Sequence, residues 1–198
     1  MRTGIFGGTF NPVHCGHLIC ARFILEQCFL DRIIFIPSKR PVHKHIEEDV
    51  SPEERYHMME CAIEGEQDFF ASRIEIDRAT DSYTIFTVNE MKAMYPDDDF
   101  FLLVGADSYN ELQTWREYTT LLRMVTLVVM RRPGDELANS HISLKEASVI
   151  FAENPRIDIS SSMIRERVVR GLSIRNMVPP AVEEYICAKG LYRSWTKK

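Results

Sequence analysis

Two histidines at the end of a glycine-rich turn are the residues whose types and spacing are best suited to chemistry. The turn runs from Gly7 to His17, follows a short apolar run, and leads into an apolar stretch with a helical pattern. Gly7 and Gly8 allow backbone conformations closed to other residues and bring N–H groups close to a ligand, while a helix start offers unpaired donors to an anion. His14 and His17 are three residues apart, so both rings lie on one side of that start. The turn therefore predicts a phosphate site.

A second segment, far downstream, has the same ligand preference. It reads Ile159-Ser160-Ser161-Ser162-Met163-Ile164-Arg165. Serine oxygens cap helix starts, and a guanidinium can bind phosphate through two parallel hydrogen bonds. Taken alone, the segment favours a serine-capped helix that carries a surface arginine.

Together the two segments resemble the H-x-G-H and I-S-S-x-x-I-R signatures of the nucleotidyltransferase superfamily. The blocks between them are similar to those of bacterial nicotinate-nucleotide adenylyltransferases, and the resemblance covers nearly the whole chain. These blocks are Pro37-Ser38 through His43-Lys44, Ser82-Tyr83-Thr84, Gly105-Ala106-Asp107-Ser108 with Trp115, and Arg132-Pro133-Gly134. The resemblance implies a Rossmann-like nucleotidyltransferase fold, with a mostly parallel sheet flanked by helices and a small C-terminal helical section.

The resemblance also implies a reaction and its substrates. The 5′-phosphate of nicotinic acid mononucleotide would attack the α-phosphorus of ATP, giving nicotinic acid adenine dinucleotide and pyrophosphate in NAD biosynthesis. The expected cofactor is Mg²⁺, held mainly by the ATP phosphates, with Asp107 as a candidate protein ligand. The nucleophile arrives ionised, so catalysis reduces to aligning two anions and stabilising charge on the phosphates.

Individual residues acquire expected roles from the same resemblance. The residues expected to act on the reacting phosphates are His14, His17, Lys44 and Arg165. The expected ATP contacts are Gly8, Thr9, Phe10, His14, His17, Gly105, Asp107, Ser161, Ser162 and Arg165. The expected contacts to nicotinic acid mononucleotide are Lys44, Thr84, Trp115 and Tyr118.

The acceptor contacts also have a physical basis, and they leave alternatives open. Thr84 lies at a predicted helix start, whose backbone donors suit a carboxylate, and the face of Trp115 can stack on a pyridine ring. Trp115 could instead be a packing aromatic. The amide mononucleotide and phosphopantetheine are rival acceptors, and a nucleotide sensor that binds ATP without turnover is a rival of another class.

Apolar strand-like runs alternate with amphipathic segments, a pattern typical of a mostly parallel α/β sheet. Strands are expected at 3–7, 32–37, 70–76, 100–105 and 125–131, with short ones at 149–151 and 157–159. Helices are expected at 18–30, 51–64, from near 82 to 95, after Ser160 and from Pro179. Because ligands bind outside the carboxyl ends of such strands, we expect both phosphate segments to converge there.

Length and composition predict one soluble domain. The chain has 198 residues, 45% hydrophobic and 27% charged, with no apolar run near the roughly 20 residues that span a bilayer. Residues 1–198 are expected to form a single nucleotidyltransferase domain, with a helical section at about 160–198. No signal-peptide pattern is present, which predicts a cytoplasmic protein without membrane contacts. A net charge of −5 disfavours nucleic-acid binding, and a homo-oligomer is compatible with the sequence.

Other site classes are disfavoured. The five cysteines contain no C-x-x-C pair, which indicates reduced thiols. Cys15 and Cys20 lie near the two histidines, but helical spacing sends the four side chains in several directions, which argues against zinc. The sequence lacks G-x-x-x-x-G-K-[ST] and G-x-G-x-x-G, so neither a kinase nor a dehydrogenase is favoured.

Overall fold

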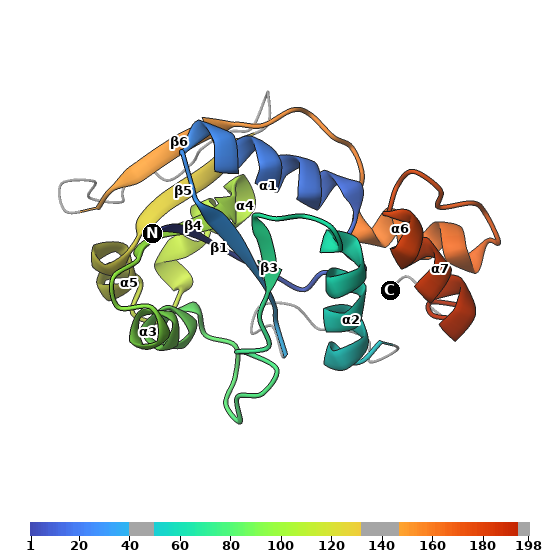
Figure 1. The fold of residues 1–198 in the computed structure, drawn as a ribbon, viewed down its shortest axis with the longest axis horizontal. Coiled ribbons are helices and arrows are strands. Elements are labelled where there is room, and N and C mark those ends of the chain that lie inside the picture. Colours follow the sequence, from blue (N-terminus) through green and yellow to red (C-terminus); the bar gives the residue numbers. More distant parts are fainter. Residues whose placement is uncertain (40–49, 132–146, 194–198) are drawn as a thin grey trace.

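A computed structural model describes residues 1–39, 50–131 and 147–193, and a parallel sheet of six strands forms its centre (Figure 1). The strands are β1 (Arg2–Gly8), β2 (Arg32–Pro37), β3 (Phe69–Ala71), β4 (Asp99–Gly105), β5 (Thr126–Arg131) and β6 (Val149–Glu153). Their order across the sheet is β3-β2-β1-β4-β5-β6, and every pairing is parallel. The chain reverses its direction across the sheet between β1 and β4, and doubly wound sheets bind ligands at this point.

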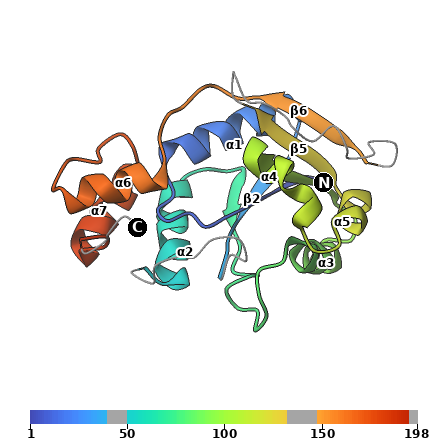
Figure 2. The ribbon, with the colours of Figure 1, turned by 180° about the vertical axis from the view of Figure 1, so that it is seen from behind.

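Helices cover both faces of the sheet. They are α1 (Cys15–Gln27), α2 (Pro52–Ile63), α3 (Thr84–Met94), α4 (Ala106–Asn110), the 3₁₀ turn η1 (Leu112–Thr114), α5 (Tyr118–Met124), α6 (Ser161–Val169) and α7 (Pro180–Lys189). Helices α6 and α7 lie together at one end of the molecule, beside α2 (Figures 1 and 2). None of the helices in the described part of the chain is long and apolar enough to cross a membrane.

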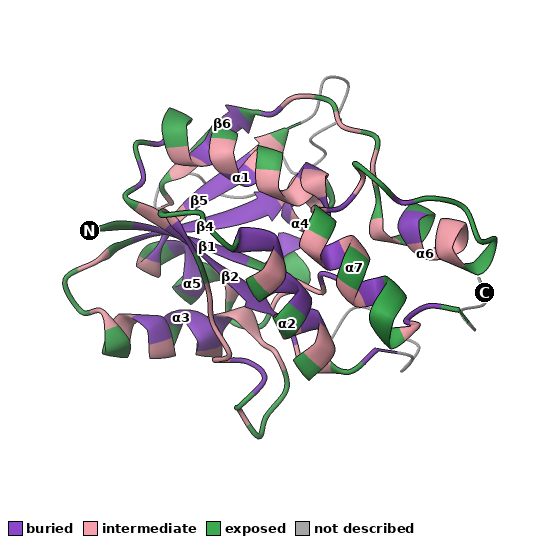
Figure 3. Cartoon of the chain, turned by 45° about the vertical axis from the view of Figure 1, so that its right-hand side comes forward, coloured by how far each residue is buried: buried purple, intermediate pink, exposed green. Residues whose placement is uncertain are grey.

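Alternating side chains on the strands build two apolar cores, one on each face. On β1, Phe6 packs into the core under α1 and α2, whereas its neighbour Ile5 packs into the core under α3 and α5. Phe35 and Ile34 divide in the same way on β2. The strands β1, β2, β4 and β5 are therefore buried on both faces (purple in Figure 3), which explains why they read as continuous apolar runs in the sequence.

The helix boundaries confirm the capping signals. Ser51 accepts the Glu54 N–H at 3.2 Å and Glu54 accepts the Ser51 N–H at 2.9 Å, so α2 starts as predicted. Ser160 accepts the Met163 N–H at 3.2 Å and caps α6. Helix α1 begins three residues before the predicted 18, because it is capped by His14.

Two strand predictions are wrong. The strand expected at 70–76 ends at Ala71, because the Ser72 N–H makes the last bond to Phe35 and the chain then turns away from β2. The short strand expected at 157–159 is an extended connection, since this segment leaves the sheet edge and passes the start of α1, where Ile157 lies close to Gly16.

Asp98 joins the amino ends of β1 and β2 to the start of β4. It accepts hydrogen bonds from Thr3 Oγ1 at 2.6 Å and from the Arg32 guanidinium at 2.8 Å. Burial opposes ionisation of Asp98, but these hydrogen bonds outweigh it and hold its pKa below the usual value. The native state therefore binds this proton more weakly than the unfolded chain does. The resulting stability is present above the ordinary aspartate pKa and is lost as pH falls through the native one.

We expect Asp98→Asn to lower the melting temperature at pH 7, and the difference from wild type to shrink as pH falls below about 4, because the unfolded wild-type chain then binds the proton and the native carboxylate follows at lower pH. Thermal unfolding followed by circular dichroism at pH 7, 5 and 3 measures this difference. Asp99→Asn, at the exposed neighbouring position, is the control and should change little. A difference that stayed constant down to pH 3 would contradict this account.

Candidate active site

The two predicted histidines lie against each other at the N-terminus of α1. His14 is the N-cap residue, and its ring stacks on that of His17 with centroids 3.6 Å apart. The His14 backbone N–H donates to His17 Nδ1 at 3.2 Å. Because Nδ1 accepts a hydrogen bond, the proton of His17 resides on Nε2. Nε2–H is thus the donor that His17 can present to a ligand.

Gly16 allows this stacked arrangement. A Cβ atom at this position would lie 3.0 Å from His14 Nδ1 and 3.1 Å from its Cε1, closer than side chains normally approach. Any larger residue would displace the His14 ring. The glycine between the two histidines is therefore a packing requirement of the pair.

Gly8 has a similar role at the end of β1. A Cβ atom on Gly8 would lie 2.9 Å from the Phe10 ring. Gly7 and Gly8 both belong to β1 and neither has a positive φ, so the expectation that they adopt conformations closed to other residues is wrong. The close approach of the Phe10 ring, rather than an unusual dihedral angle, is what requires glycine at position 8.

Phe10 packs its ring between His17 and the apolar core. Its backbone is left-handed, with φ 48°, and its ring is buried in edge-on contacts with Phe6, Phe35 and His17 at centroid distances of 5.6, 5.9 and 5.1 Å. This ring is core, so only the backbone of Phe10 remains for the predicted contact to a nucleotide.

The second predicted segment docks on the first. Ser161 Oγ donates to the Pro12 carbonyl at 2.8 Å, and the Arg165 guanidinium donates to the Asn11 carbonyl at 2.6 Å. Arg165 also donates to Ser162 Oγ at 3.1 Å. The N-terminus of α6 therefore lies against the turn that carries the histidines, although 149 residues separate Ser161 from Pro12.

Tyr192 is a supporting residue that sequence reasoning missed. Its hydroxyl donates to Asn11 Oδ1 at 2.7 Å, and both side chains are buried. Burial raises the pKa of Tyr192, so the phenol remains a donor. Asn11 is thus held through its side chain by Tyr192 and through its carbonyl by Arg165. No local sequence signal connects these positions.

Arg55 on α2 was also missed, and it is the most deeply buried charged side chain near the turn, with 1% exposure. It donates to the Thr9 carbonyl at 2.6 Å, to the Ser38 carbonyl at 2.6 Å and to the Lys39 carbonyl at 3.4 Å. Burial lowers its pKa, yet a guanidinium stays charged at physiological pH. Arg55 therefore joins the turn after β1 to the end of β2.

A periodic signal could have revealed Arg55. It occupies the same face of α2 as Met58, Met59 and Ala62, all of which are buried. An arginine at an i, i+3, i+4, i+7 apolar position requires buried acceptors, and here they are backbone carbonyls at strand ends.

Gly105 is the last residue of β4, and Asp107 follows it in α4. Strand β4 is next to β1, and the strand order reverses between these two strands. Gly105 is the N-cap of α4, and the space that its Cβ would fill is open. Asp107 is exposed in the first turn of α4. Both positions suit the predicted contact to a ligand above the sheet edge.

A resident metal cage is not found in the described part of the chain, where no three His, Cys, Asp or Glu side chains gather around one point. Cys15 lies beside the histidines, but burial raises the pKa of its thiol, which keeps it protonated and a poor metal ligand.

The predicted acceptor contacts come from neighbouring elements. Thr84 is the first residue of α3, Trp115 follows η1, and Tyr118 begins α5. The Arg116 guanidinium lies over the Tyr83 ring at 5.1 Å, which brings the start of α3 beside the Trp115 segment. Trp115 is half-buried and packs on the core beneath α3 and α5, so it combines a packing role with an accessible face.

Two predicted blocks cannot be placed. Lys44 lies outside the described residues, and so do Arg132, Pro133 and Gly134. Their expected roles stay predictions.

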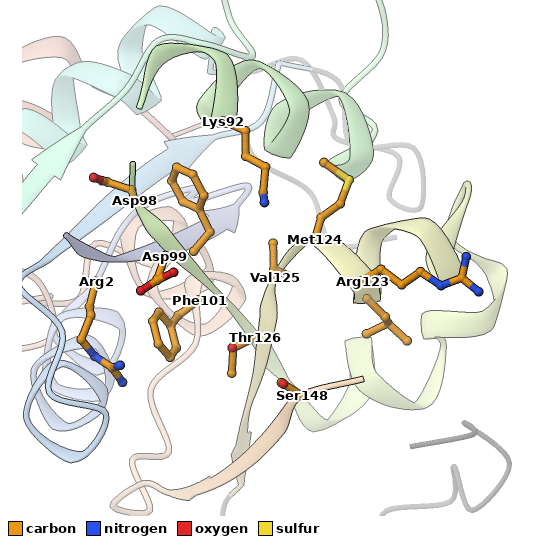
Figure 4. Close-up of a pocket in the computed structure, with 12 residues that line it drawn as sticks. Arg2, Lys92, Asp98, Asp99, Phe101, Arg123, Met124, Val125, Thr126 and Ser148 are labelled. Atoms are coloured by element: carbon orange, nitrogen blue, oxygen red, sulfur yellow. The ribbon is translucent and has the colours of Figure 1, made fainter. Parts of the chain in front are cut away.

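A pocket at the opposite edge of the sheet is distinct from this site (Figure 4). Its lining includes Asp98 and Asp99 at the start of β4, and Thr126 at the start of β5. Because the phosphate segments lie beyond the carboxyl ends of the strands, this pocket is not part of the site that they form.

Comparisons with known proteins agree with the geometry. Residues 5–167 match the family described as cytidylyltransferase-like. Over 98% of its length the chain is 41% identical to a probable nicotinate-nucleotide adenylyltransferase of Rubrobacter xylanophilus and covers 93% of that protein. It is 42% identical to one of Geobacillus thermodenitrificans, with 98% and 88% of the two chains covered.

A solved structure has the same fold. It is Plasmodium falciparum nicotinic acid mononucleotide adenylyltransferase complexed with NaAD, with a TM-score of 0.78 at 18% identity. The match covers 96% of this chain and 97% of that one. The likeness confirms the nucleotidyltransferase fold that the sequence predicts.

Proposed function

The chain belongs to the cytidylyltransferase-like family and, within it, to the nicotinate-nucleotide adenylyltransferases, and from this membership we propose that it transfers the adenylyl group of ATP to nicotinic acid mononucleotide. The products are nicotinic acid adenine dinucleotide and pyrophosphate. The docking of Arg165 and Ser161 on the histidine turn is the observation that carries the proposal, since it gathers anion-binding groups at the reversal point of the sheet.

The geometry suits a direct displacement. The attacking phosphate oxygen is already ionised, so no general base is needed, and the difficulty is to align two anions that repel each other. His17 would donate through Nε2–H to an ATP phosphate at the positive end of the α1 dipole. His14, stacked on it, would bind the same phosphate group. Preformed donors of this kind stabilise the charge that develops on the transferring group and on pyrophosphate.

Arg165 has two roles in this proposal. It fixes the turn through the Asn11 carbonyl, and it carries a permanent positive charge beside the β- and γ-phosphates. Ser161 holds the turn through Pro12, while Ser162 is exposed and accepts a hydrogen bond from Arg165.

Magnesium fits this site as an ion that arrives with ATP. A magnesium ion is commonly bound by one or two carboxylates together with substrate phosphates, and Asp107 is an exposed carboxylate at the end of β4. When bound, the ion would neutralise charge on the ATP phosphates.

The acceptor would bind along α3 and the segment after η1. The backbone N–H groups at Thr84 suit the nicotinate carboxylate, and Trp115 and Tyr118 offer faces for the pyridine ring. Lys44 is assigned to the mononucleotide phosphate by resemblance. Cytoplasmic location, expected from the sequence, remains part of the proposal.

Pyrophosphate release tests the proposal. The protein is mixed with ATP and Mg²⁺ and, in parallel, with nicotinic acid mononucleotide, nicotinamide mononucleotide or phosphopantetheine. Preference for the acid supports the proposal. Preference for another acceptor overturns the acceptor site and retains the ATP site. ATP binding without pyrophosphate release in the presence of any of the three acceptors would favour a nucleotide sensor.

Replacing Arg165 by lysine should lower kcat/KM by about 10- to 100-fold, because a single ammonium nitrogen cannot reproduce the planar geometry in which two guanidinium nitrogens bond to Asn11 and Ser162. Hydrogen bonds to charged groups are worth about 1.5–3 kcal/mol. Steady-state kinetics with varied ATP measures the loss. Arg170→Lys, at the end of the same helix, is the matched control, since Arg170 is exposed and forms a surface ion pair with Glu166. Equal activity of the two variants would refute the role of Arg165.

A further inference from the structure

Glu75 is a buried carboxyl group that the proposed reaction does not use. It lies in the connection between β3 and α3 (green in Figure 1) and is only 6% exposed. Its Oε1 accepts a hydrogen bond from Thr87 Oγ1 at 2.6 Å, and the Ser82 hydroxyl also hydrogen-bonds to it. Ser82 and Thr87 lie on either side of Thr84, so the two bonds hold the first turn of α3 from both ends.

The Thr87 hydroxyl is fully used in this arrangement. A hydroxyl has one proton, which Thr87 donates in its hydrogen bond to Glu75. The Thr87 oxygen accepts hydrogen bonds from both terminal nitrogens of Arg78, each at 3.2 Å. Arg78 is fixed in turn by Glu90, 2.8 Å from its Nε. The orientation of Thr87 is therefore determined on both sides, by a cation and by a buried carboxyl group.

Ser82 extends the arrangement to the end of β2. Its hydroxyl accepts the Lys39 backbone N–H at 3.1 Å, and Lys39 Nζ donates to the Arg78 carbonyl at 2.7 Å. Lys39 also lies beside Ser38, whose carbonyl accepts from Arg55. Glu75 thereby connects the start of α3 with the strand end that Arg55 ties to the nucleotide turn.

A buried carboxyl group is costly unless its hydrogen bonds are made. Burial raises the pKa of Glu75, while the hydroxyls of Thr87 and Ser82 and the charge of Arg78 oppose that shift, and Glu90 adds to it. An apolar side chain of similar size would avoid this cost. What it could not do is fix the directions of two hydroxyl groups, and geometric specificity of this kind is a well-supported use of buried polar groups.

We propose that Glu75 is a positioning residue for the acceptor half-site: through Ser82 and Thr87 it sets the first turn of α3 so that the backbone donors at Thr84 face the acceptor carboxylate. This inference depends on the proposed function for the identity of the acceptor. It assigns Glu75 no contact with substrate.

Kinetics and hydrogen exchange of single variants test the proposal. Glu75→Gln and Thr87→Val should each raise KM for nicotinic acid mononucleotide about tenfold, the effect of one lost hydrogen bond to a charged group, with KM for ATP and kcat changed less than about twofold. Thr87→Ser retains the hydroxyl and should restore the wild-type KM. In the protein without substrates, amide exchange at residues 84–87 should accelerate in Glu75→Gln and Thr87→Val.

Asp77→Asn is the matched control, because Asp77 is an exposed carboxylate in the same connection and forms its ion pair with Arg73. Equal rises in both KM values, or the same effects in Asp77→Asn, would overturn the positioning role. A wild-type protein that showed no acceptor-dependent turnover would refute the proposed function instead, and exchange at residues 84–87 would still decide whether Glu75 fixes the start of α3.

Discussion

Replacing His17 by alanine should lower kcat by about 10²–10³-fold, which is the usual cost of removing one preorganised donor to a developing charge. The physical reason is specific to its geometry. Nδ1 accepts the His14 N–H, so Nε2 carries the proton that His17 can donate to a phosphate. The measurement is single-turnover pyrophosphate release with saturating ATP and nicotinic acid mononucleotide, which isolates the chemical step from product release.

Two further variants separate catalysis from helix capping. His17→Asn keeps an acceptor for the His14 N–H, so it should restore the thermal stability lost in His17→Ala and remain as slow. His17→Gln places an amide donor farther out and should recover part of the rate. His57→Ala, at an exposed histidine on α2, should behave as wild type. Near-native turnover in His17→Asn would show that His17 has only a structural role.

Arg55→Met should destabilise the protein by about 2–6 kcal/mol, because the carbonyls of Thr9 and Ser38 lose their donor and each unsatisfied buried group costs about 1–3 kcal/mol. The remaining folded protein should also bind ATP more weakly, since Thr9 belongs to the predicted nucleotide turn. Urea unfolding measures the first effect, and calorimetric titration with Mg-ATP measures the second.

The controls for Arg55 vary charge and exposure. Arg55→Lys retains the charge but reaches fewer carbonyls, so its stability should lie between those of wild type and Arg55→Met. Arg170→Met removes an exposed arginine with a single surface ion pair and should change stability by less than about 1 kcal/mol. If Arg55→Met were as stable as Arg170→Met, the hydrogen bonds from Arg55 to the Thr9 and Ser38 carbonyls would contribute nothing to the stability of the fold.

Local patterns along the chain were sufficient to predict the fold class and the location of the phosphate segments. Strands buried on both faces must be apolar throughout, and a serine at a helix start with glutamate three residues later caps that helix in any context. These are local signals, and they placed β1, β2, α2 and α6 within a few residues. The spacing of His14 and His17 likewise fixed their common side of α1 before any tertiary contact was known.

The contacts that hold the site together join residues that are far apart in the chain, and the sequence did not predict them. Three buried residues hold polar groups of residues elsewhere in the chain: Arg55, Tyr192 and Glu75. The sequence around a buried polar residue does not indicate which groups will be its hydrogen-bond partners. The same limit explains the error over Gly7 and Gly8. The two glycines predicted backbone conformations closed to other residues. The requirement at Gly8 is instead the Phe10 ring packed against it, and this contact exists only after the turn has folded.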